Sequence, residues 1–296
     1  MVAKIILAHQ CFKLIRMPPW PILRNAASDS SVISPSRALI GVVLAAGVAV
    51  AARRWGALQT SGAWGAMACG ALSVTAGGMW MVALLTFFGS STVLSRWRRD
   101  RKEQLTRNVV EKPGARDLTQ VAANGGVFAV CALLSLLAPS PVWMIAGLGS
   151  LAAATADTWA TEVGTAIGGT PRMIFGFAPV VSGTSGAVTL AGTAAMTGGA
   201  ITMGTVGWIA GFDPGQVFAV WSGGVTGALV DTLVGATIQE RRWCGTCQCG
   251  TEQRVHRCGT LSVPSGGLAF MTNDTVNLTS TLTGALTAVA VARLVA

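Results

Sequence analysis

The stretch LAAATADTWATEVG, residues 151–164, places two carboxylates, Asp157 and Glu162, inside a run of small and apolar residues. Apolar runs recur along the whole chain at the length of a helix. A helix that spans a bilayer needs about 20 predominantly apolar residues. About eight stretches approach that length, namely 38–52, 57–74, 77–95, 119–138, 141–163, 186–211, 216–239 and 273–295. The sequence therefore predicts an all-α, polytopic helical membrane protein with about eight transmembrane helices.

The composition supports a membrane location. The 296 residues are 51% hydrophobic and only 11% charged, whereas soluble domains carry about 25% charged residues. We divide the chain into an N-terminal extension, 1–37, and a membrane domain, 38–296, with a Cys/His loop at 240–270. The extension is basic and has the composition of a targeting segment, but a disordered or interfacial tail explains that composition equally well.

The basic residues gather in alternate connecting segments. They comprise Arg53 and Arg54, eight Lys and Arg residues between 96 and 116, Arg172, and four arginines in the Cys/His loop. The positive-inside rule places these loops on the cytoplasmic or stroma-like face. Such a face can serve topology alone or can bind a substrate that carries phosphate. Nucleic acid is excluded as a partner because the charges are divided among membrane loops.

Four acidic residues lie within predicted helices, in the half of each helix that is nearest the basic face. They are Asp157, Glu162, Asp231 and Asp274. Ionisable residues inside a membrane are costly and indicate function by default. Amide side chains accompany them at helical spacing: Gln120 and Asn124 after Arg116, Gln239 after Asp231, and Asn273 and Asn277 around Asp274. Such an oxygen-rich set suits Mg²⁺, and it suits coupling to protons or sodium almost as well.

The two acids of the opening stretch are five positions apart, about 140° around a regular helix. They can share one site only if the helix breaks, for which Gly164 offers a position. Otherwise one of them packs elsewhere.

Two glycine-rich segments lie at the same face. EKPGARDLTQVAANGG, residues 111–126, supplies Lys112 and Arg116 before a helix. SGTSG, residues 182–186, precedes the sixth predicted helix, and it offers Gly183, Thr184, Ser185 and Gly186 as a cradle for phosphate. Neither segment has the GK[ST] ending of a nucleotide-binding P-loop.

The Cys/His loop, WCGTCQCGTEQRVHRCG, predicts a structural Zn²⁺ site. It contains Cys244, Cys247, Cys249, His256 and Cys258, and a tetrahedral zinc site needs four such ligands. One ligand is therefore spare, either Cys249 or His256. Thiols on a cytoplasmic face stay reduced, which favours metal binding over a disulfide.

Several blocks, in this order, resemble the transmembrane protein nineteen family, also called domain of unknown function 92. They are EKPGARDLTQVAANGGV, ADTWATEVG, SGTSGAVTLAGT, GALVDTLVGATIQ, VHRCG and NDTVNL. The resemblance implies an integral membrane protein. The family includes a plant phytyl-phosphate kinase, which makes phytyl diphosphate with CTP as the donor. The resemblance carries family motif positions onto Asp157, Glu162, Asp231, Asn273, Asp274 and Asn277. The chain departs from the family pattern at Pro113, Ala115 and Thr232.

The leading hypothesis is an intramembrane kinase that phosphorylates an isoprenyl monophosphate with a nucleoside triphosphate, CTP by resemblance. Mg²⁺ would be held by some of Asp157, Asp231 and Asp274, with Glu162 nearby, while Arg116 and Lys112 neutralise the transferred group. The amides and the 183–186 loop would contact substrate or nucleotide. The alternatives are a lipid cytidylyltransferase and an ion-coupled transporter. One-sided clustering disfavours the transporter, because carriers place their sites near the midplane.

Overall fold

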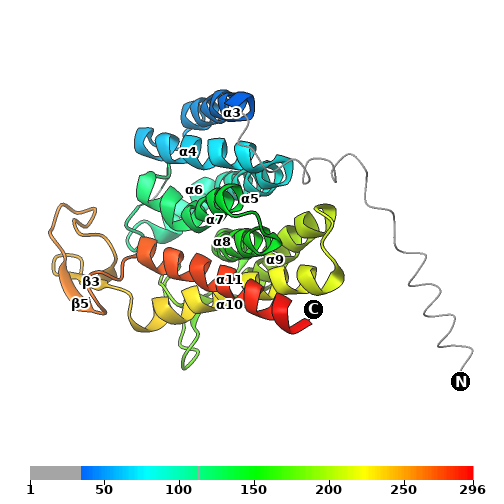
Figure 1. Ribbon diagram of the computed structural model, residues 1–296. Helices are drawn as coiled ribbons and strands as arrows, with labels where there is room; N and C mark the ends of the chain where they lie inside the picture. Colours follow the sequence, from blue (N-terminus) through cyan, green and yellow to red (C-terminus); the bar gives the residue numbers. More distant parts are fainter. Residues whose placement is uncertain (1–34, 113, 296) are drawn as a thin grey trace, which may run out of the picture.

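A computed structural model of the chain describes residues 35–112 and 114–295 (Figure 1). Eight long helices occupy the eight predicted spans: α3 (Pro35–Arg54), α4 (Thr60–Ala76), α5 (Gly78–Arg96), α7 (Leu118–Leu137), α8 (Pro141–Ile167), α9 (Leu190–Ile209), α10 (Pro214–Thr237) and α11 (Asn273–Val295). Five of them, α3, α5, α7, α10 and α11, are each long and apolar enough to cross a membrane. The prediction of a helical membrane protein is confirmed.

Most predicted boundaries differ from the observed ones by one to four residues, and three of the differences affect the extension, the sixth predicted helix and α8. Residues 35–37 of the proposed extension form the first turn of α3, and residues 1–34 lie outside the described residues. The helix predicted from 186 begins at Leu190, because Ala187–Val188 form strand β2, which pairs with β1 (Arg172–Met173). Helix α8 shows no break at Gly164 and continues to Ile167.

Helix α8, which carries the opening stretch, lies at the centre of the bundle. It packs against α5, α7, α9, α10 and α11, and every residue from Ile145 to Ala156 is buried. The buried hydroxyls of Ser150 and Thr155 donate to carbonyls of their own helix, at 2.8 and 2.6 Å. The run of small residues thus explains how one helix can be enclosed by five others.

Glycines set the close contact among α8, α10 and α11. A Cβ added at Gly149 would lie 2.6 Å from the Gly284 carbonyl oxygen, and one at Gly223 would lie 2.4 Å from the same oxygen. A Cβ at Gly227 would lie 2.4 Å from that of Ala153. Small residues permit this approach of membrane helices.

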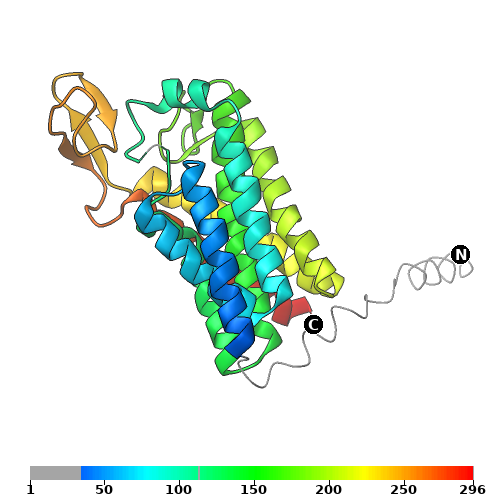
Figure 2. The ribbon, with the colours of Figure 1, turned by 90° about the horizontal axis from the view of Figure 1, so that it is seen from above.

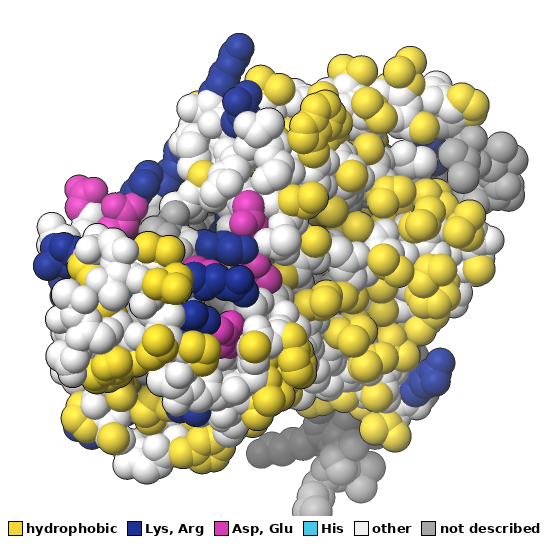
Figure 3. Space-filling view, turned by 90° about the vertical axis from the view of Figure 1, so that its left-hand side faces the viewer, with side chains coloured by type: hydrophobic (Ala, Val, Ile, Leu, Met, Phe, Trp, Pro, Cys, Tyr) yellow, Lys and Arg dark blue, Asp and Glu magenta, His cyan; other side chains and the backbone are white. Residues whose placement is uncertain are grey.

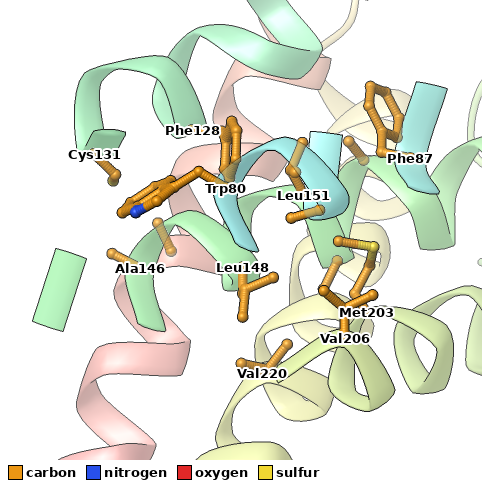
Figure 4. Packing of buried hydrophobic residues seen from close by; sticks show 14 of the residues in the cluster. Trp80, Phe87, Phe128, Cys131, Ala146, Leu148, Leu151, Met203, Val206 and Val220 are labelled. Atoms are coloured by element: carbon orange, nitrogen blue, oxygen red, sulfur yellow. The ribbon is translucent and has the colours of Figure 1, made fainter. Parts of the chain in front are cut away.

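An aromatic cluster joins α5 and α7 to the central helix (Figure 4). The rings of Trp80 and Phe128 are tilted, with centroids 5.2 Å apart, and Leu148 and Leu151 of α8 complete this part of the core. The outer face is also apolar over a wide area (Figure 3). Leu190, for example, is 93% exposed. An apolar exterior around a packed core is expected for helices that face lipid.

The connecting segments at one end of the bundle contain the remaining helix and strands (Figure 2). These are the short helix α6 (Arg99–Thr106), the β1–β2 pair, and a three-stranded sheet in the Cys/His loop. That sheet has the order β4-β3-β5, formed by Cys249–Thr251, Arg241–Cys244 and Val263–Gly266. Asp117 caps α7 at this end with a capping box, in which its side chain accepts from the Gln120 amide.

Candidate functional site

A cavity of about 460 Å³ opens at this end of the bundle, beside a gathering of charged side chains (Figure 3). Its walls come from α5, α6, α7, α8, α9, α10 and α11 and from the four basic connecting segments. The predicted site residues that line it are Lys112, Arg116, Gln120, Asn124, Asp157, Glu162, Gly183, Thr184, Ser185, Gly186, Asp231, Asn273, Asp274 and Asn277. The topology therefore brings together residues that are up to 165 positions apart, from Lys112 to Asn277.

Asp157 of α8 and Asp231 of α10 lie next to each other in the wall of the cavity. Their side chains lie within hydrogen-bonding contact of each other. Asp231 Oδ2 is buried and accepts from no donor in the described part of the chain. An ionised carboxylate has no hydrogen to donate, so this contact requires a proton or a cation between the two groups.

Arg116 places a positive charge on the same cavity. Its backbone is fixed by two hydrogen bonds, from its amide to the Ala57 carbonyl (3.1 Å) and from the Gln59 amide to its carbonyl (2.9 Å). The guanidinium makes no hydrogen bond or ion pair with any described residue. Burial lowers its pKa, whereas the nearby Glu162 carboxylate raises it. An arginine remains charged in any protein, and this one faces space that an anion can fill.

Glu162 occupies a different wall from Asp157. It accepts from Ser95 Oγ at 2.5 Å and forms an ion pair with Lys102. Lys102 of α6 is only 7% exposed, and it also donates to the carbonyls of Leu94 (2.7 Å) and Ser95 (3.0 Å). Glu162 is thus held by Ser95 and Lys102 and is not part of the Asp157–Asp231 contact, as expected for two acids about 140° apart on one helix. Both acids nevertheless line one cavity, without a break in the helix.

Asp274 forms a separate ionic cluster at the mouth of the cavity. Lys112 Nζ lies 2.6 Å from Asp274 Oδ2 and 3.0 Å from Asp117 Oδ2, and Thr119 Oγ1 donates to Asp274 Oδ2 at 2.9 Å. Partial burial lowers the pKa of Lys112, but its hydrogen bonds to the two carboxylates outweigh this effect and raise the pKa. Asp274 therefore has a cationic partner in Lys112, whereas no cationic side chain in the described part of the chain pairs with Asp157 or Asp231.

The 182–186 loop is held from two sides. Gly186, at φ +79°, lies against α10, where an added Cβ would be 2.4 Å from Ala236 Cα. Ser185 Oγ donates to Glu252, a residue of the Cys/His loop that also accepts from Gln239 Nε2 at 3.0 Å. Gln239 was predicted as a ligand contact but does not line the cavity. It is buried and holds Glu252 instead.

The Cys/His loop brings four potential metal ligands together. The ligand atoms of Cys244, Cys247, His256 and Cys258 all lie within 4.8 Å of one another. Cys249 is the spare residue, since its sulfur lies outside this group, 3.8 Å from His256 Nε2. Within the described ranges, Asp157, Asp231 and Asp274 do not converge in this way.

An apolar groove begins where the cavity meets Arg116. It encloses about 100 Å³ between α3, α4, α5 and α7. Arg116, Gln120 and Asn124 line both spaces, so the groove continues from the polar cavity. Its other walls are apolar, and they include Val48, Ala66, Leu84, Leu85 and Phe88.

Comparison with known protein families shows to which family this chain belongs. The model of the integral membrane protein family DUF92 matches residues 43–285. The chain belongs to the DUF92 family. The resemblance inferred from the motifs is thereby confirmed.

Relatives of this DUF92 protein occur in archaea, plants and cyanobacteria. An uncharacterised membrane protein of Methanocaldococcus jannaschii is 33% identical over 55% of this chain and 66% of its own length. Protein PGR of Arabidopsis thaliana is 26% identical over 86% of this chain and 96% of its own length. An uncharacterised membrane protein of Synechocystis is 30% identical over 55% and 64% of the two chains. No solved structure matches.

Among the charged residues of the DUF92 cavity that sequence reasoning missed, Lys102 and Glu252 bond to predicted site residues, Glu162 and Ser185 respectively. Both lie in segments rich in exposed polar residues, where a single charge gives no signal. Two features could have suggested them. Lys102 lies on a short charged helix next to a membrane-spanning helix, and Glu252 lies between metal ligands in the sequence.

Proposed function

We propose that this DUF92 protein is an intramembrane kinase that transfers a phosphoryl group from a nucleoside triphosphate, CTP as the first candidate, to an isoprenyl monophosphate. The observation that carries the proposal is the cavity itself. It contains a buried carboxylate pair and an arginine whose guanidinium has no hydrogen-bond or ion-pair partner among the described residues, and an apolar groove begins at that arginine. Such a site suits a ligand with phosphates at one end and a hydrocarbon tail at the other.

The transfer requires positioning and charge neutralisation rather than a strong base. An oxygen of the acceptor phosphate is already ionised and attacks the γ-phosphorus. The bond from that phosphorus to the β–γ bridging oxygen breaks, and CDP leaves. Arg116 and Lys112 would neutralise the transferred group, and the amides of Gln120, Asn124, Asn273 and Asn277 would orient the phosphates.

Asp157 and Asp231 are the residues best suited to hold Mg²⁺. Their carboxylates are in contact, and Asp231 Oδ2 has no donor among the described residues. Mg²⁺ prefers one or two carboxylates together with substrate phosphates. An ion held by these two carboxylates would supply positive charge to offset that of the donor phosphates. Asp274 is assigned to the ionic cluster with Lys112 instead. The Cys/His cluster would hold a structural Zn²⁺, and the basic end would face the cytoplasm or a stroma-like compartment.

The apolar groove would take the part of the tail next to the phosphate. With the head group at Arg116, the first carbons would enter between α4, α5 and α7, and the rest of the tail would extend into the bilayer. Burial of each CH₂ contributes about 0.8 kcal/mol, so even a short enclosed segment would favour lipid phosphates over soluble ones.

The deciding experiment is product analysis. Purified protein in lipid is incubated with phytyl or geranylgeranyl phosphate, Mg²⁺ and each nucleoside triphosphate. We expect a lipid diphosphate and a nucleoside diphosphate. A CDP-lipid with pyrophosphate would instead identify a cytidylyltransferase. Absence of product with every donor, together with proton or sodium flux in vesicles, would replace the kinase with a transporter.

A further inference from the structure

Two ligand pairs of the four-ligand cluster lie at distances close to those of a tetrahedral metal site. Cys244 and Cys258 sulfurs are 3.6 Å apart, and His256 Nδ1 lies 3.2 Å from Cys258 Sγ. Ligand lengths of about 2.3 Å for sulfur and about 2.0 Å for nitrogen place ligand atoms about 3.5–3.8 Å apart around zinc. The Cys247 amide also lies 3.5 Å from Cys244 Sγ, where it stabilises a thiolate. His256 and Cys244 are buried, whereas Cys247 and Cys258 are exposed, so the cluster extends from the interior of the loop to its surface.

The same hairpin that supplies His256 inserts Glu252 into the cavity. Strand β4 pairs with β3 next to the first ligand, with Cys249 opposite Cys244. Glu252 follows β4 directly, lines the cavity, and acts electrostatically on Asp231. It is therefore a third acidic side chain near the Asp157–Asp231 pair. It belongs to the Cys/His loop and not to a membrane-spanning helix.

The hairpin also holds the segment that leads to Lys112 and Arg116. The Glu252 amide donates to the Val109 carbonyl at 2.8 Å. Gln253 Nε2 donates to the carbonyls of Arg107 (3.0 Å) and Val110 (2.9 Å). Together with the bond from Ser185 to Glu252, these contacts join three loops that are far apart in the sequence.

We propose that the cluster binds Zn²⁺ and that the bound ion is a clamp, which fixes Glu252 in the cavity and holds the 107–110 and 183–186 segments around it. Without the ion, the hairpin has no large apolar core of its own to keep its shape, because structural zinc supplies the folding free energy of such small units. Metal occupancy would then control how well the cavity binds phosphate ligands. Only this last consequence rests on the proposed function.

Metal content tests the site. We expect about one zinc per chain in the wild type and in Cys249→Ser, the matched control that removes the spare sulfur. Cys247→Ser and Cys258→Ser should lose it. Equal zinc content in all four proteins, or none in the wild type, would overturn the site.

Amide hydrogen exchange tests the clamp without any need for turnover. Treating the full-length wild type with a chelator should raise exchange at least tenfold at 249–256, 107–110 and 183–186, while α8 and α10 keep their protection. Added zinc should reverse the change. Increased exchange confined to 244–258 would show a metal site that does not clamp the cavity, and would overturn the proposal. Failure of the kinase assay alone would leave this result intact.

Discussion

At the scale of single residues, the Asp157–Asp231 contact has opposite consequences for stability and for function. Two buried carboxylates in contact raise the free energy of the folded state unless a proton or cation lies between them. Asp231→Asn supplies an amide donor to Asp157, so it should raise the melting temperature in detergent by about 2 °C or more. The same change should lower the proposed kinase activity about 100-fold, because it removes one of the two carboxylates proposed to hold Mg²⁺.

Asp213→Asn is the matched control for that substitution. Asp213 caps α10 by accepting from the Gln216 amide at 3.0 Å, and asparagine caps a helix equally well. Its activity and melting temperature should match those of the wild type. An Asp231→Asn protein that keeps full activity would contradict the role of the acid pair.

Glu252 should make stability depend on pH. Burial raises its pKa from 4.5 to about 7. Between these values the folded protein keeps a proton that the unfolded chain has lost, so stability falls as pH rises from about 4.5 to about 7 and then levels off. Glu252→Gln should remove this slope. Melting temperatures of both proteins across that range provide the measurement, and parallel curves would refute the assignment.

At the scale of elements, the helices could be predicted because apolar length and composition alone determine them. The cavity could be predicted in outline, since Asp157, Asp231 and Arg116 come from helices and loops at one end of the bundle. Spacing on one helix was less informative. Asp157 and Glu162 point in different directions and still reach one cavity, because that cavity extends around α8. Glu252 depends on how a loop folds back, which no local pattern encodes.

Glycine packing among α8, α10 and α11 can be tested by replacing two glycines, one at a close helix contact and one in open space, with alanine. A Cβ at Gly284 would lie 2.6 Å from the Gly149 carbonyl oxygen, whereas one at Gly89 of α5 meets nothing within 4 Å. Gly284→Ala should destabilise the bundle by about 1–3 kcal/mol. Gly89→Ala should be neutral or slightly stabilising, since alanine favours a helix. Thermal unfolding in detergent compares them, and equal melting temperatures would refute the close contact.

At the scale of the whole molecule, the charge distribution predicts orientation. The basic segments converge on the cavity end, so the positive-inside rule predicts that this end faces the cytoplasm or a stroma-like compartment. A membrane-impermeant maleimide should label Ser140→Cys, at the opposite end of α8, in intact cells. Arg101→Cys should react only after permeabilisation, with labelled peptides identified by mass spectrometry. The reverse pattern would invert the topology.

The continuity of the polar cavity with the apolar groove predicts how substrate length is recognised. Ala66 of α4 lines the groove but not the cavity, so Ala66→Phe should fill the tail site and leave the phosphate site intact. Loss of about two buried CH₂ contacts corresponds to about a tenfold weaker interaction. The KM for phytyl phosphate should therefore rise about tenfold, while kcat and the KM for a short prenyl phosphate stay near wild type. If both substrates weaken equally, the tail does not enter between α4 and α5, and the groove has no part in selecting the lipid.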